Sequence, residues 1–205
     1  LKVVIENFPE NKTEWLEAVN NPNSSRQELR KIPFSREIWI EQDDFMEEPP
    51  NKFFRLAPGK EVRLRYAFFI TCNDLIKDKG GNLVELRCSY DPETRGGNAP
   101  DGRKVKGTIH WVSVQHAKDA EVRIYNSFYN SPTPGRDRDF IDDINPNSLE
   151  VLTNCKIEPD LVTLNKTTPI QFERLGYFYK DLDSGPDLPV YNRTISLRDT
   201  WNKKP

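Results

Sequence analysis

The chain has 205 residues, of which 36% are hydrophobic and 11% aromatic, so it can build the core of one large domain or two small ones. Its formal net charge of -2 excludes a molecule whose overall field attracts polyanions, and any basic surface must be local. No apolar run approaches the roughly 20 residues of a membrane-spanning helix. The first residues, LKVVIENFPE, lack a Met and begin inside a strand-like run, so we expect a piece of a longer protein.

Two short stretches near the start of the chain have helical spacing. In 13–19, Thr13 is a candidate N-cap and Leu16 and Val19 are the residues to bury. The second stretch is 24–30. These two stretches predict the only sizeable helical segments of the chain.

Apolar and polar residues alternate with a period of two through most of the remaining chain, which predicts strands. In the segment 61–71, this alternation puts Arg63 and Arg65 on the face opposite the apolar residues. Turn-forming Gly, Pro, Asn and Asp residues separate the segments. Many short strands with spaced turns predict an all-β fold of sandwich or barrel type. The expected strands fall within 35–42, 61–71, 82–90, 120–129, 148–157, 170–179 and 190–199.

The segment 52–65 is locally basic, with five cations against one acid, and includes Phe53 and Phe54. Arginine forks among aromatic rings are the mixture that binds phosphates and unstacked bases. A charge run of this kind is more often a solvated face, so composition alone leaves both interpretations open.

The segment 101–113, DGRKVKGTIHWVS, follows a turn rich in Gly and Pro and reads as a half-buried strand. Lys104, Lys106 and His110 share its polar face, opposite Ile109 and Trp111. This face is either a solvated surface or one that meets nucleic acid. A catalytic histidine would need partners from other strands, which the sequence does not show.

The remaining motifs do not indicate a metal site or a catalytic centre. The segment 137–143 has four Asp residues but lacks the Gly and Glu of a calcium loop, and predicts a capped helical turn. Cys72, Cys88 and Cys155 are odd in number and widely spaced, which argues against a disulfide framework and a zinc site and favours the reducing cytoplasm. No Walker loop, GxSxG or HExxH motif occurs.

Several blocks in order resemble the C-terminal anticodon-binding region of glutaminyl-tRNA synthetases, a class I family. Each block is weak alone, but the ordered set covers nearly the whole chain. The resemblance implies two tandem β-barrels with exchanged strands and a few short helices, the first over 1–102 and the second over 103–205. The blocks are KVVIENF, IPFSREIWIEQDDF, GKEVRLR, DGRKVKGTIHWVS, INPNSLEV, QFERLGYF and NRTISLRDTW.

The resemblance also implies roles for individual residues in anticodon binding. Arg55 takes the place of the reader of the third anticodon base, a guanine, and Arg63 that of a reader of the first base, with Arg65 close by. Gln171 and Arg174 take the places of the contacts to the central uracil. The implied contacts to the loop or its phosphates are Lys52, Lys104 and Lys106.

Two departures limit this transfer from the family. Phe54 stands where the family can have a basic residue, which puts one backbone contact in doubt. A further family arginine lies upstream of Leu1. If Arg55 is not a reader, the alternative is that it pairs with a surface acid such as Glu48.

The implied activity belongs to a longer enzyme. The HIGH-like and KMSKS-like signatures of the catalytic domain are absent, so we expect no catalytic residue, metal or cofactor in this chain, with ATP and Mg²⁺ bound elsewhere in the full enzyme. The expected partner is glutamine tRNA, without DNA or membrane binding, and the expected state is a cytoplasmic monomer. Two alternatives stay open: a glutamyl-type relative of the same fold, and a carbohydrate-binding β module that uses the Asp-rich turns.

Overall fold

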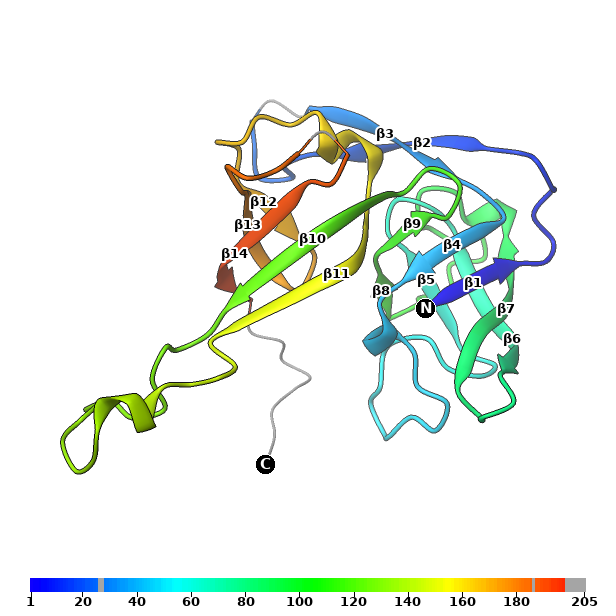
Figure 1. The fold of residues 1–205 in the computed structure, drawn as a ribbon. Helices are drawn as coiled ribbons and strands as arrows, with labels where there is room; N and C mark the ends of the chain where they lie inside the picture. Colours follow the sequence, from blue (N-terminus) through cyan, green and yellow to red (C-terminus); the bar gives the residue numbers. More distant parts are fainter. Residues whose placement is uncertain (26–27, 186, 198–205) are drawn as a thin grey trace. The chain divides into compact units, whose positions relative to one another are not determined.

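The computed structural model describes residues 1–25, 28–185 and 187–197 (Figure 1). The chain divides by its internal contacts into two compact units, the first ending at Ala117 and the second beginning at Lys118. Both are built from strands and short 3₁₀ helices, which confirms the all-β prediction.

The first unit contains a seven-stranded sheet that is nearly closed into a barrel. Its end strands, β8 and β9, flank the single residue His110. β8 pairs with β5 and β9 pairs with β4, so the short segment 108–113 supplies the strand at each end of the sheet. In sheet order the strands are β8 (Thr108–Ile109), β5 (Glu61–Leu64), β6 (Phe69–Lys77), β7 (Leu83–Asp91), β1 (Lys2–Ile5), β4 (Glu37–Ile40) and β9 (Trp111–Ser113).

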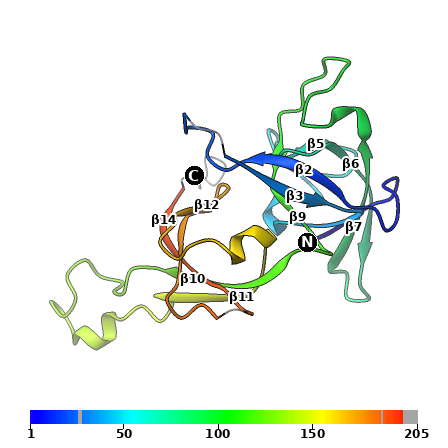
Figure 2. The same cartoon turned by 90° about the horizontal axis from the view of Figure 1, so that it is seen from above.

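A two-stranded ribbon completes the first unit: β2 (Glu14–Val19) pairs with β3 (Leu29–Phe34) (Figure 2). Its short helices are η1 (Gln42–Asp44) and η2 (Pro92–Thr94). The side chains that pack inside the unit form one apolar cluster. Its most deeply buried members include Ile5, Phe8, Phe34, Ile38, Leu56, Leu64, Ile70, Leu86 and Ile109.

The second unit is a five-stranded sheet with edge strands β11 (Leu149–Ile157) and β12 (Ile170–Phe172). Between them lie β10 (Lys118–Tyr125), β14 (Val190–Ser196) and β13 (Gly176–Lys180). Its short helices are η3 (Phe140–Asp143) and η4 (Pro159–Val162). A separate apolar cluster packs this unit, made of Ala120, Val122, Ile157, Ile170, Phe178 and Tyr191.

The helical prediction for 13–19 is wrong, because these residues form β2. Leu16 and Ala18 are buried while Trp15 and Glu17 are exposed, a period of two. In 24–30, β3 starts at Leu29, and residues 26 and 27 lie outside the described residues. The helical turn expected at 137–143 is confirmed as η3, capped by the Asp139 carboxylate, which accepts from Ile141 N.

Two of the segments predicted as single strands, 61–71 and 170–179, each form a hairpin of two strands. The chain reverses after β5 at Tyr66, whose φ is 63°, and β6 returns antiparallel to β5. It reverses again at Arg174, with φ 65°, between β12 and β13. Neither turn has a Gly at the left-handed position, so the usual sequence mark of a tight turn is missing.

The segment 101–113 was expected at the junction of the two barrels, and in the structure its strands β8 and β9 pair within the first sheet. The contacts therefore divide the chain after Ala117 rather than after Gly102. Exchange of strands between the two barrels stays a prediction. The C-terminal block NRTISLRDTW forms part of β14 up to Ser196, and its residues from 198 onward lie outside the described residues.

Candidate nucleic-acid interface

Arg63 lies on the outer face of β5, directly opposite Phe69 of β6. Its guanidinium lies 5.4 Å from the centre of the Phe69 ring. Arg63 Nε is buried and has no hydrogen-bond partner among the described residues. Gly97 packs against the stem, because a Cβ there would lie 2.9 Å from Arg63 Cδ. Buried donors are rarely left unpaired in folded proteins, so the unpaired Nε is an unusual feature of this outer face.

Arg103 lies over the same ring, with its guanidinium 5.4 Å from the Phe69 centroid. Its Nε and Nη2 each donate to one oxygen of Glu61 at 3.0 Å, and Nη1 donates to Asp101 at 2.7 Å. Nη2 also donates to Asp91. The side-chain hydrogen bond from Arg103 lowers the pKa of Asp91, and its backbone and side-chain bonds lower that of Asp101. Arg103 thus binds three carboxylates at once.

Arg65 lies in the turn after β5 rather than on the strand face where the alternation placed it. Its guanidinium lies 5.0 Å from the centre of the Tyr66 ring. Its backbone is fixed on both sides: Arg65 N donates to Ile109 O, and Arg65 O accepts from Trp111 Nε1, both at 3.0 Å. Arg63 and Arg65 therefore lie over different aromatic rings.

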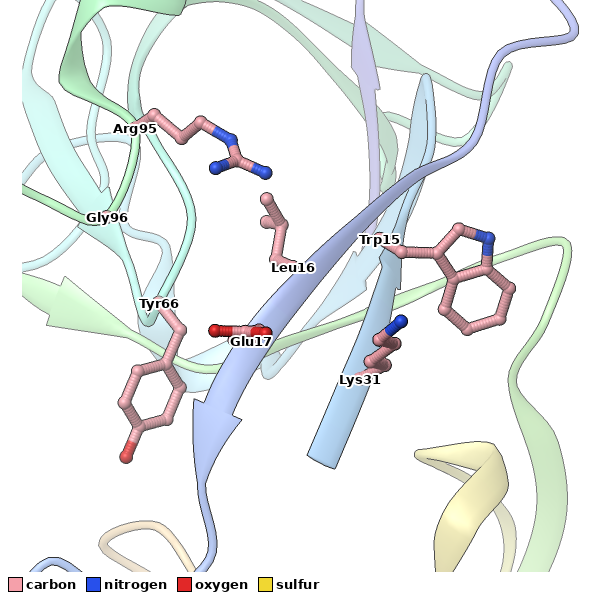
Figure 3. Close-up of a pocket in the computed structure, with 7 residues that line it drawn as sticks. All are labelled: Trp15, Leu16, Glu17, Lys31, Tyr66, Arg95 and Gly96. Atoms are coloured by element: carbon pink, nitrogen blue, oxygen red, sulfur yellow. The ribbon is translucent and has the colours of Figure 1, made fainter. Parts of the chain in front are cut away.

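A pocket of about 500 Å³ lies beside this turn (Figure 3). Two cationic side chains and two aromatic rings are among its walls, and Trp15 is half exposed. Rings beside cations are the usual lining of sites for single-stranded nucleic acid. No residue predicted for the anticodon lines it, although Tyr66 is the ring under Arg65. The lining residues are Trp15, Leu16, Glu17, Lys31, Tyr66, Arg95 and Gly96.

Arg55 is tied to η1. Its Nη1 donates to Asp43 O at 3.0 Å, and its Nε lies 3.5 Å from Asp44 Oδ1. The side chains of Arg55 and Asp44 are 13% and 1% exposed. The structure thus places the buried carboxylate of Asp44 beside Arg55. Lys52, three residues before Arg55, is exposed and lies at a turn position with φ 69°.

Lys106 Nζ lies 5.2 Å from the centre of the exposed Phe54 ring. Gly107 brings the two segments together: a Cβ there would lie 2.3 Å from Phe54 O, and Gly107 O accepts from Arg63 N at 2.9 Å. Lys104 is exposed. The segment 104–107 therefore joins the Phe54 loop to the strand that carries Arg63.

Gln171 is exposed on the edge strand β12, opposite Tyr177 of β13. Tyr177 is in turn opposite Ile195 of β14, and both side chains are exposed. Arg174 lies at the hairpin turn between β12 and β13. The two residues predicted for the central base thus belong to one hairpin of the second unit, beside an exposed aromatic ring.

Family models for this sequence match both units. The description of both is "tRNA synthetases class I (E and Q), anti-codon binding domain", over residues 1–91 and 108–181. The chain belongs to this family of anticodon-binding domains. The expected resemblance is confirmed, and it sets aside the carbohydrate-binding alternative.

Curated relatives match along the whole chain. Glutamine–tRNA ligase of Bradyrhizobium diazoefficiens is 58% identical over 204 residues, covering 100% of this chain and 36% of the relative. Glutamine–tRNA ligases of Pseudomonas putida and Clostridium kluyveri are 51% and 49% identical, each over 98% of this chain and 36% of the relative. The chain thus spans about a third of the length of these relatives.

The structure of this anticodon-binding chain also shows the state of its cysteines, its potential metal ligands and its helices. Cys72, Cys88 and Cys155 are free thiols. Among the described residues, no group of three potential metal ligands gathers, and no helix is long and apolar enough to cross a membrane.

Sequence reasoning found the cations of this anticodon-binding domain but missed several of their neighbours. Arg103 escaped attention because its carboxylate partners come from segments up to 42 positions away. Trp15 was hidden by the helical interpretation of its segment. The structure joins Arg63 with Phe69, Arg65 with Tyr66, Lys106 with Phe54, and Arg55 with Asp44.

Proposed function

We propose that this chain is the anticodon-recognition part of a glutamine–tRNA ligase. The observation that carries the proposal is the match to glutamine–tRNA ligases over the whole chain, at 58% identity in one case. The chain binds the anticodon stem-loop of glutamine tRNA, so that a catalytic part outside this chain can attach glutamine with ATP and Mg²⁺. The cytoplasm and a monomeric state are the expected setting.

In this proposal each unit contributes contacts to the splayed anticodon bases. Arg63 reads the first base, supported by its position on the outer face of β5 beside the Phe69 ring. Arg65 lies close by, and Arg55 reads the third base, a guanine, whose O6 and N7 accept from an arginine fork. Gln171 and Arg174 contact the central uracil, for which the amide of Gln171 supplies both a donor and an acceptor.

Lys52, Lys104 and Lys106 contact the loop or its phosphates. The exposed ring of Phe54 next to Lys106 offers a stacking surface beside a cation. This pairing gives Phe54 a use where the family can have a basic residue.

The first test is binding to a fluorescent anticodon stem-loop of glutamine tRNA. We expect Arg63→Ala to weaken binding by about 1–3 kcal/mol, because it removes donors to a base edge. Affinity should fall as salt rises, with a log–log slope of about -0.7 for each phosphate contacted in a single-stranded loop. Arg87→Ala is the control, since Arg87 is an outer-face arginine of the same sheet whose Nη2 pairs with Glu85 at 2.7 Å.

The same assay with the stem-loop of glutamate tRNA separates the glutaminyl proposal from the glutamyl-type alternative. Preference for the glutamate stem-loop would favour the alternative. Equal, salt-independent binding of both would contradict anticodon recognition altogether.

A further inference from the structure

The ring of Phe69 is buried outside the apolar core of the first unit. Its strand neighbour Ile70 belongs to the core cluster, whereas Phe69 is 1% exposed and does not. In the register, Arg63, Phe69 and Asp91 lie side by side across β5, β6 and β7. The guanidinium groups of Arg63 and Arg103 both lie over this ring. Two like charges therefore share one aromatic support on the outer face of the barrel.

Arg103 binds three carboxylates beside this ring. Arg103 holds Glu61 through two hydrogen bonds and also binds Asp91 and Asp101. Backbone geometry adds to the arrangement, because Arg103 N donates to Asp101 Oδ1 at 3.0 Å. Planar guanidinium donors in fork–fork contact are the strong form of such pairs.

Among the described residues, Arg63 has no such carboxylate partner. Glu61 is two residues before it on β5 and therefore on the same face, roughly 7 Å away along the strand. That distance is within reach of a flexible arginine and a glutamate, yet both Glu61 oxygens are bound to Arg103. A carboxylate pair at Arg63 would occupy the donors that a base edge needs.

We propose that Arg103 is a positioning residue that withdraws these acids from Arg63, leaving the Arg63 donors for the acceptors of an RNA base. The proposal rests on the proposed function, because it assumes that Arg63 faces the anticodon. In this proposal Arg103 affects base specificity although its own donors bind carboxylates of the protein rather than the RNA. Arg103 adds a positive charge beside the site, but its donors are used on Glu61, Asp91 and Asp101.

The experiment measures base preference in the full-length protein that contains this chain. Two anticodon stem-loops that differ in the first base alone, with anticodons CUG and AUG, are titrated against each variant. We expect Arg103→Met to lower the ratio of affinities for the CUG and AUG stem-loops at least fivefold, as Arg63→Ala is also expected to do. We expect the double variant Arg63→Ala/Arg103→Met to lose little more, because both changes remove the same contact.

Adding Glu61→Gln to Arg103→Met is the decisive comparison. A neutral amide cannot capture Arg63 as a carboxylate does, so we expect most of the lost preference to return. The matched control Arg87→Met removes an arginine with the same charge change from the same outer face and should keep the preference. A thermal melt of each variant reports the fold, and Arg103→Lys is a milder substitute that keeps the charge but loses the fork.

Three results would overturn the proposal: an unchanged preference in Arg103→Met and Arg103→Lys, an equal loss of affinity for both stem-loops, or no recovery with Glu61→Gln. Failure of the proposed function looks different. In that case Arg63→Ala itself leaves the preference intact, or wild type does not distinguish the stem-loops at all, and the proposal falls with it.

Discussion

Arg55 contacts η1 in this structure, and its side chain is also proposed to read a guanine. The contact to Asp44 matters for folding: the Asp44 carboxylate is 1% exposed, and a buried charge that loses a partner is destabilising. At the residue scale the sequence shows which cations are present but not what holds them. Asp44 and Arg103 meet their partners because the fold brings separate segments together, and no local pattern in the sequence predicts such pairs.

For Arg55→Ala we expect a loss of unfolding free energy of about 1–3 kcal/mol, because a buried carboxylate loses a charged donor. Urea unfolding measures it. Base reading is tested separately, by titrating wild type and Arg55→Ala against stem-loops with guanine or adenine as third anticodon base. A reader loses about 1–3 kcal/mol with guanine and much less with adenine. Arg55→Lys should restore neither the fork nor the preference. Equal losses for both stem-loops would leave Arg55 with its structural role alone.

At the element scale, strand positions followed from the alternation, while reversals and pairings did not. The segments of β4, β7, β10, β11 and β14 were predicted from a period of two. The turns at Tyr66 and Arg174 were missed because neither has a Gly at the left-handed position. The pairing of β8 and β9 within the first sheet did not follow from the sequence, because partners distant along the chain decide pairing. The same long-range contacts place Lys106 against Phe54, which the sequence could not show.

Gly107 is the element-scale position that we expect to tolerate change least. A Cβ there would lie 2.3 Å from Phe54 O, a backbone atom, so Gly107→Ala forces β8 and the 53–55 loop apart. Overpacking of this kind costs about 1–3 kcal/mol. We expect a lower urea midpoint and weaker stem-loop binding, since Phe54 and Lys106 separate. Gly185→Ala is the control, because a Cβ there meets open space. An unchanged midpoint in Gly107→Ala would show that the loop yields without cost.

For the whole molecule, the net charge of -2 does not show which cations are bound to carboxylates and which are exposed. In the first unit Glu61, Asp91 and Asp101 bind Arg103. In the second unit Asp181 lies 3.5 Å from Arg123 Nη1 and accepts from Asp183 N at 2.7 Å. The charge of an arginine held in this way is largely offset by its carboxylates, whereas Lys104 and Lys106 stay exposed. The basic surface is therefore smaller than the count of cations suggests, which composition alone could not reveal.

These acid clusters predict how stability responds to pH. Hydrogen bonds from Arg103 lower the pKa of Asp91 and Asp101 from the ordinary value of 3.8, and a backbone N–H lowers that of Asp181 in the second unit. A carboxylate whose folded pKa is lowered stabilises the fold above its unfolded pKa and loses that contribution as pH falls through the folded pKa. We expect the urea midpoint to be level from neutral pH to about pH 5 and to fall from about pH 4 downward.

Arg103→Met provides the test of this assignment, because the variant removes the partner that lowers the pKa of Asp91 and Asp101. Its midpoint should be lower than wild type at neutral pH, and the difference should shrink toward pH 3, where the carboxylates of wild type are also being protonated. Arg87→Met keeps the Arg103 cluster and should follow the acid response of wild type. A constant difference between Arg103→Met and wild type across the pH range would show that Arg103 stabilises the first unit by packing on Phe69 rather than by binding carboxylates.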